Sequence, residues 1–74
     1  MYVWVMNFVE DPDERVAASA QRAYEICREY IEEGIQTEPL RKECLEELAE
    51  SYHECPDWFG CSEVCSVERI EVEV

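Results

Sequence analysis

The chain has 74 residues, which is enough for one small domain and too short for a second. It contains 19 acidic and 6 basic residues, so its formal net charge is −13 at pH 7. A surface this negative repels nucleic-acid phosphates and anionic lipid head groups, which excludes both as direct ligands. The longest nearly apolar run, residues 1–9, is too short to span a bilayer and follows no basic segment. We therefore expect a single cytoplasmic domain over residues 1–74, with neither a membrane span nor a signal peptide.

Residues 1–9 are rich in β-branched and aromatic side chains, which favours a strand over a helix at this length. Both sides of this strand are apolar: Tyr2, Trp4, Met6 and Phe8 on one, Val3, Val5 and Val9 on the other. A strand with one solvated face alternates with polar residues, so either both faces are buried or one face contacts a partner. The edge of this first strand could also pair with its counterpart in a homodimer.

Two helices are expected to follow. The sequence Asp-Pro-Asp-Glu at residues 11–14 is typical of a helix start, with Asp11 as the N-cap. A second helix is expected to begin near Pro39, and the short link makes the two helices antiparallel. Apolar residues at steps of three and four give the first helix one stripe: Val16, Ala20, Ala23, Tyr24, Cys27, Tyr30 and Ile31. The second stripe contains Leu40, Cys44, Leu45, Leu48, Ala49 and Tyr52.

Residues 55–65 show no periodicity and are expected to be irregular, whereas the alternation from Arg69 onward predicts a final strand. The predicted fold class is α+β: a β-α-α-β domain with two antiparallel helices packed on one face of a small antiparallel sheet. Because two strands are marginal on their own, a third is expected from the segment around residue 60 or from another copy of the chain.

The glutamates follow helical spacing. On the second helix they are Glu43, Glu46, Glu47, Glu50 and Glu54, and on the first Glu25, Glu29, Glu32 and Glu33. Like charges one turn apart repel, which weakens a domain with a thin core. A solvated face or a halophilic source would explain the pattern without any partner. The functional interpretation is that these nine residues bind a basic protein surface that normally holds phosphates, with the second helix as the first choice.

In length, acidity, compact α/β pattern and lack of a catalytic motif, the chain resembles small phage-encoded inhibitors, which include the anti-CRISPR proteins and other DNA mimics. The resemblance covers the whole chain in composition and includes no specific motif, so no residue role is transferred. It implies a non-enzymatic inhibitor in the host cytoplasm. Its partner would be a basic nucleic-acid-binding protein or complex, such as a CRISPR effector, whose nucleic-acid site it blocks.

The cysteines and the lone histidine offer an alternative. His53, Cys55, Cys61 and Cys65 have the ligand types of a structural zinc site, although no Cys-x2-Cys pair is present. In an oxidising compartment one or two disulfides would form instead. Either case would give a cysteine-stapled or zinc-stabilised interaction module without nucleic-acid mimicry. Without a signal peptide, free thiols and no cofactor are expected, and His53 is more simply a helix-end histidine near the C-terminal end of the helix dipole.

Two further features concern chemistry and contact. The sequence contains no Gly-rich phosphate loop, Ser/His/Asp set or calcium loop, and its glutamates fall on exposed faces, so an enzyme is not expected. Trp58 and Phe59 lie between Pro56 and Gly60. This pair either covers an open edge of the core or forms an exposed interface anchor.

Overall fold

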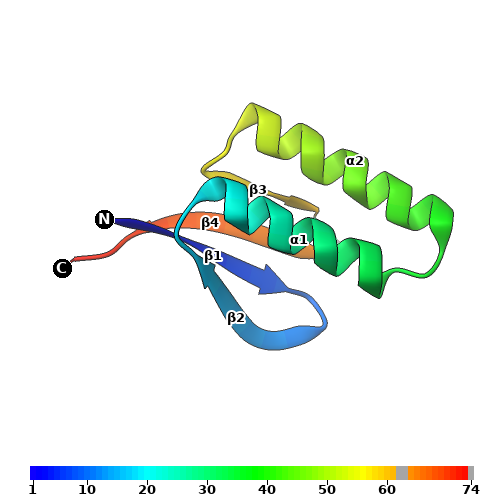
Figure 1. The fold of residues 1–74 in the computed structure, drawn as a ribbon, viewed down its shortest axis with the longest axis horizontal. Coiled ribbons are helices and arrows are strands. Elements are labelled where there is room, and N and C mark those ends of the chain that lie inside the picture. Colours follow the sequence, from blue (N-terminus) through cyan, green and yellow to red (C-terminus); the bar gives the residue numbers. More distant parts are fainter. Residues whose placement is uncertain (62–63, 74) are drawn as a thin grey trace.

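The computed structural model describes residues 1–61 and 64–73. The elements in chain order are β1 (Tyr2–Phe8), β2 (Asp11–Ala17), α1 (Ala20–Gly34), α2 (Glu38–Glu54), β3 (Trp58–Cys61) and β4 (Cys65–Glu71). The strands form one antiparallel sheet in the order β2-β1-β4-β3, and both helices lie on the same face of it (Figure 1). The predicted α+β class, with two antiparallel helices on one face of an antiparallel sheet, is confirmed. The structure adds β2 and β3 to the expected order.

β1 lies in the middle of the sheet because its helix-facing side chains supply much of the core. Met6 and Phe8 are buried, and each lies opposite a buried residue of β4, Val67 and Cys65 respectively. β1 is hydrogen-bonded to β2 on one edge and to β4 on the other. Neither edge of the first strand is therefore open to another copy of the chain, because the outer strands of the sheet are β2 and β3.

Residues 11–17 form β2, so the prediction that residues 11–14 open a helix is wrong. The side chain of Asp11 accepts a hydrogen bond from the N–H of Asp13 (3.0 Å), a local turn contact instead of a helix cap. Farther along, Ala17 is buried opposite Trp4, and the Arg15 guanidinium lies 5.3 Å from the centre of the Phe8 ring. Pairing with β1 satisfies backbone groups along the segment and overrides the local helix signal.

α1 begins at Ala20, where the side chain of Ser19 accepts a hydrogen bond from the N–H of Arg22 (3.1 Å). Both helices then bury the residues that the periodicity predicts: Ala23, Cys27, Ile31, Cys44 and Leu48. Val16, expected on the first stripe, is instead exposed on β2. Among the described residues, neither helix has the length and apolar character needed to cross a membrane.

β3 comes from the segment expected to be irregular, and it supplies the third strand from this chain instead of another copy. Phe59 and Cys61 are buried against the helices, while Trp58 is exposed on the other side. A Cβ atom at Gly60 would lie 2.5 Å from the carbonyl oxygen of Cys65. A glycine at this position therefore permits the close pairing of β3 with β4.

Candidate functional site

The five glutamates predicted on the second helix are exposed along one flank of α2. Leu48 of this helix is buried on the side that faces the sheet. The ring of Tyr52 stacks on that of Tyr24 in α1, with the ring centres 4.6 Å apart. Helical spacing then places the glutamates on the flank away from α1, above β3. The Cys61 thiol of β3 donates a weak hydrogen bond to the Glu47 carboxylate (3.6 Å), which fixes this orientation. We call Glu43, Glu46, Glu47, Glu50 and Glu54 the α2 acidic flank.

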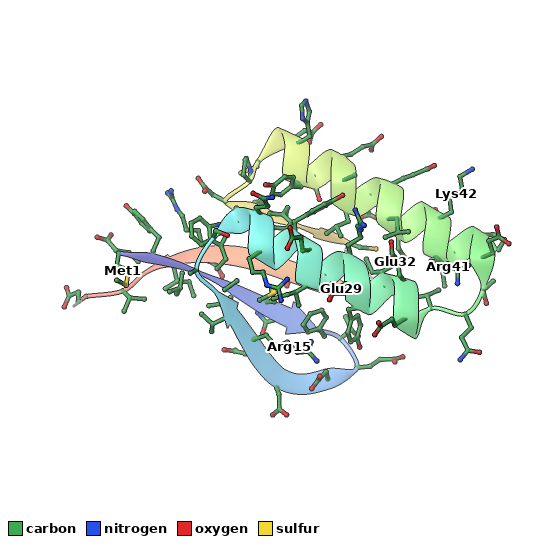
Figure 2. All side chains as sticks on the ribbon, viewed as in Figure 1. Met1, Arg15, Glu29, Glu32, Arg41 and Lys42 are labelled. Atoms are coloured by element: carbon green, nitrogen blue, oxygen red, sulfur yellow. The ribbon has the colours of Figure 1, made fainter. Side chains whose placement is uncertain are left out.

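The four glutamates of α1 are also exposed, but they do not join the α2 acidic flank. Helical spacing places the acids on the side of α1 away from the buried Cys27 and Ile31, and Figure 2 shows Glu32 on the edge of α1 that faces α2 and Glu29 on the other edge. Two of them are paired: Arg22 with Glu25 at 3.2 Å and Arg28 with Glu32 at 3.4 Å. The structure thus separates the predicted contact residues into two sets. The charge of the set on α1, which consists of Glu25, Glu29, Glu32 and Glu33, is partly neutralised by these two arginines.

The alternative metal ligands are not brought together. His53 and Cys55 are exposed at the end of α2, whereas Cys61 and Cys65 are buried beneath the helices. Within residues 1–61 and 64–73, no three His, Cys, Asp or Glu side chains are placed to hold a metal ion. The predicted set of His53, Cys55, Cys61 and Cys65 is therefore not assembled as a zinc site.

The five cysteines are free thiols, and four of them are buried. One thiol contact joins α1 to β4, where the side chains of Cys27 and Cys65 share a hydrogen bond. This hydrogen bond, together with burial, raises the pKa of Cys27 far above its ordinary value of 9.0. A thiol held in its protonated form is a poor nucleophile, so Cys27 acts as a core residue, whereas the same hydrogen bond lowers the pKa of Cys65.

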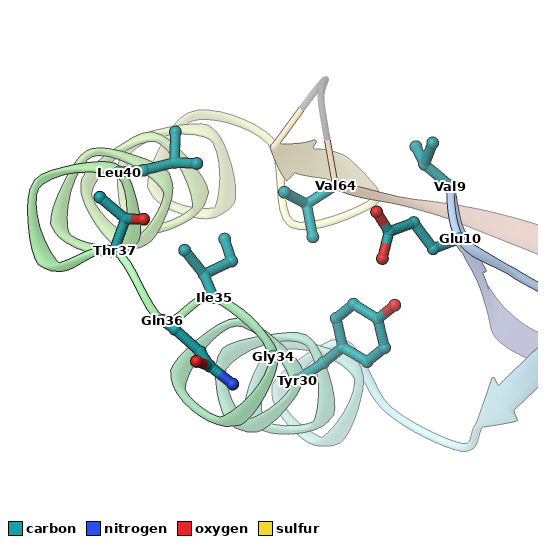
Figure 3. Close-up of a pocket in the computed structure, with 9 residues that line it drawn as sticks. All are labelled: Val9, Glu10, Tyr30, Gly34, Ile35, Gln36, Thr37, Leu40 and Val64. Atoms are coloured by element: carbon teal, nitrogen blue, oxygen red, sulfur yellow. The ribbon is translucent and has the colours of Figure 1, made fainter.

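A pocket of about 350 Å³ lies where the end of α1 and the link to α2 approach the β1–β2 turn and Val64 (Figure 3). The Glu10 carboxylate and the Tyr30 hydroxyl lie on one side of it, and Ile35 and Leu40 on the other. Its described lining contains no histidine, cysteine or lysine to pair with Glu10. The lining residues come from three separate stretches of the chain, around residues 9–10, 30–40 and 64, so no local pattern in the sequence indicated this pocket.

Within residues 1–61 and 64–73, no element covers the sheet face opposite the helices (Figure 1), although half-buried or exposed apolar side chains lie on it. Phe59 belongs to the core, whereas the adjacent Trp58 is 72% exposed on this uncovered side. Val16 and Ile70 are 60% and 42% exposed. Cross-strand pairing places one further acid in the same group of side chains. We call this group the open face: Val3, Val5, Val16, Trp58, Glu68 and Ile70.

Comparison with protein-family models, with curated protein sequences and with solved structures finds no match for this chain. The α2 acidic flank and the open face are the two surfaces whose side-chain chemistry indicates a function.

Proposed function

We propose that the protein is a non-enzymatic inhibitor that binds a basic nucleic-acid-binding protein and blocks its nucleic-acid site by charge mimicry. The observation that carries the proposal is the α2 acidic flank. Its five carboxylates share one side of a single helix and are exposed. Rows of fixed negative charge of this kind attract basic clefts and accelerate association with them.

The spacing of the charges supports mimicry of a polyanion. Residues 43–54 extend over about 16 Å of helix axis, so the five carboxylates follow one another at steps of about 1.5 to 6 Å, with a mean of about 4 Å. One strand of a DNA duplex presents a phosphate about every 3.4 Å along the axis. A groove lined with arginines and lysines at phosphate spacing would therefore find acceptors along α2 at a similar mean density, although not at regular intervals.

The distribution of arginines also favours α2 over α1 as the contact surface. Arg22 and Arg28 each pair with a glutamate of α1. The basic residues of α2, Arg41 and Lys42, lie near its start, and the Arg41 guanidinium donates to the carbonyl of Ile35 (3.2 Å). The later turns of α2 hold Glu46, Glu50 and Glu54, and residues 43–54 contain neither arginine nor lysine, so their charge is available to a partner.

The test is a competition experiment with a protein captured from a bacterial lysate on the immobilised wild-type chain. The captured protein is expected to bind labelled DNA or RNA, and the wild-type chain is expected to displace that probe. A triple variant, Glu46→Lys, Glu50→Lys and Glu54→Lys, should lose displacement by at least about 100-fold, because opposite charges become like charges. Glu47 is left unchanged because its carboxylate accepts the Cys61 thiol.

The matched control carries the same change in net charge on exposed acids outside the helices: Glu10→Lys, Glu71→Lys and Glu73→Lys. This variant should retain most of the displacement, and raising the salt concentration should weaken the wild-type complex. Equal loss in both variants would show that net charge acts without a specific surface. A captured partner that keeps its nucleic acid in the presence of the wild-type chain would refute the mimicry.

A further inference from the structure

The open face contains one row of side chains that crosses the sheet. Val16 of β2 lies opposite Val5 of β1, Val5 lies opposite Glu68 of β4, and Glu68 lies opposite Trp58 of β3. Val3 and Ile70 form a second opposed pair beside this row. Directly opposite residues project from the same side of the sheet, so these side chains are neighbours on one surface.

The residues at these positions differ from those normally found on a solvent-exposed sheet face. The solvated face of an antiparallel sheet is normally polar, yet four aliphatic residues and an indole occupy this one. Trp58 is 72% exposed, and a tryptophan at the centre of an interface is among the residues most often found to dominate binding. The composition of the open face is that of a contact surface with one central charge, Glu68.

The sheet edges are less suited to a partner than its face. On β3, the Ser51 hydroxyl occupies the outward N–H and carbonyl of Gly60, at 3.1 and 2.9 Å. On β2, Pro12 has no N–H to offer to an added strand. A partner therefore meets side chains of the open face and does not extend the sheet through backbone hydrogen bonds.

The net charge of the chain and the carboxylate of Glu68 indicate which kind of partner can bind the open face. A second copy would bring another chain of net charge −13 against Glu68, which like-charge repulsion disfavours. A guanidinium suits the pair formed by Trp58 and Glu68, since it stacks on an aromatic face and bonds a carboxylate in the same pose. Within this chain, Arg69 already has both contacts: its guanidinium lies 4.3 Å from the centre of the Tyr2 ring and 3.3 Å from the Asp57 carboxylate.

The open face is also continuous with the α2 acidic flank. Trp58 and Glu47 line the same hollow of about 320 Å³ beside the edge of β3. A basic protein seated on α2 would therefore extend over Gly60 to the indole.

We propose that the open face docks a protein that presents an arginine among aliphatic side chains, with the guanidinium held between the Trp58 indole and the Glu68 carboxylate. The valines and Ile70 receive the aliphatic neighbours of that arginine. The inference goes beyond the proposed function, because it holds whether or not the partner handles nucleic acid.

The test is an NMR titration of the full chain, labelled with ¹⁵N, at 150 mM salt. The probe is the capped tripeptide acetyl-Val-Arg-Val-amide, and its control contains citrulline, the neutral isostere of arginine. Saturable shifts are expected for the Trp58 indole N–H and for amides of Val5, Val16 and Ile70. The citrulline peptide should bind at least about fivefold more weakly, because it lacks the charge that Glu68 and the indole attract. Shifts confined to the helices, or none at the indole up to 10 mM probe, would overturn the proposal.

Two variants localise the site. Trp58→Ala should weaken binding of the arginine peptide by about tenfold or more, and Glu68→Gln by about threefold, whereas Val9→Ala is a control at an exposed residue of the turn between β1 and β2. All three positions are exposed, so the thermal transitions should stay close to that of the wild type. Sedimentation equilibrium decides against a second copy. A wild-type dimer that Trp58→Ala converts to a monomer would overturn the proposal in favour of self-association.

Discussion

The hydroxyl of Ser51 in α2 holds both backbone groups of Gly60 in β3. It donates to the Gly60 carbonyl at 2.9 Å and accepts from the Gly60 N–H at 3.1 Å. One side chain thus replaces the neighbouring strand that β3 lacks on its outer edge. It also ties the end of α2 to the sheet, at the strand that carries the exposed Trp58.

Replacing Ser51 with alanine should therefore weaken the fold and uncover an edge. Loss of both hydrogen bonds leaves a half-buried N–H and carbonyl without their protein partner, which costs about 1–2 kcal/mol of unfolding free energy. Urea denaturation measures the loss, and size-exclusion chromatography measures any self-association through β3. Ser66→Ala, at an exposed position of β4, is the control and should stay within about 0.5 kcal/mol of the wild type. Equal stability of both variants would contradict the role of Ser51.

The two glycines should respond in opposite ways to alanine. At Gly60 the added Cβ would lie 2.5 Å from the Cys65 carbonyl oxygen and 2.8 Å from the Ser66 Cα, so Gly60→Ala should cost about 2–3 kcal/mol. At Gly34, the last residue of α1, an added Cβ would meet no atom within 4 Å. Gly34→Ala should leave the protein unchanged or more stable by up to about 1 kcal/mol. Thermal unfolding compares the two, and a neutral Gly60→Ala would show that β3 and β4 are not packed this closely.

The N-caps provide a second matched pair. The Ser19 side chain accepts a hydrogen bond from the Arg22 N–H. Thr37 occupies the N-cap position of α2, but its side chain makes no capping hydrogen bond. Ser19→Ala should therefore cost about 1 kcal/mol, and Thr37→Ala less than about 0.5 kcal/mol. Chemical denaturation followed by circular dichroism measures both. A larger loss for Thr37→Ala would contradict the assignment of the α1 start.

The start of α1 also shows where sequence reasoning fails. Asp11 and Ser19 are both good N-caps, and local rules have no means of choosing between them. Long-range pairing makes the choice, because residues 11–17 complete the hydrogen bonds of β1. The periodicity that begins at Ala20 predicts the buried residues Ala23, Cys27, Ile31, Cys44 and Leu48, because it reflects burial against the sheet, whereas Leu40 and Ala49 of the second predicted stripe are exposed.

The site was predictable in a similar, partial way. The spacing of glutamates correctly indicated exposed rows on two helices, but the pattern within one helix says nothing about which side faces its neighbour. Trp58 was recognised as a possible anchor, yet its relation to Glu68 depends on the pairing of β3 with β4. The segment that contains β3 has four strand residues and no alternation, which is too short a pattern to predict that pairing.

The thiols distinguish the proposed inhibitor from a cysteine-stapled module. In the folded protein Cys55 is exposed and the other four cysteines are buried, so one thiol should react rapidly with Ellman's reagent under native conditions. All five should react in denaturant, and Cys55→Ala should abolish the rapid phase. Fewer than five thiols in the denatured protein purified without reductant would instead indicate a disulfide and favour the stapled module.

The pair formed by Cys27 and Cys65 should make stability fall at high pH. The hydrogen bond to Cys65 and burial raise the pKa of Cys27 in the folded state, so this thiol keeps its proton where the unfolded chain, with an ordinary value of 9.0, releases it. The folded state then binds more protons than the unfolded state above about pH 9. The stabilising contribution is therefore complete below that pH and is lost as the pH rises, by about 1.4 kcal/mol per unit for one proton.

Urea denaturation at several pH values with reductant measures this slope. Cys27→Ala should make the slope shallower, because it removes the thiol that keeps its proton in the folded state. A slope equal to that of the wild type would show that Cys27 does not retain its proton in the fold.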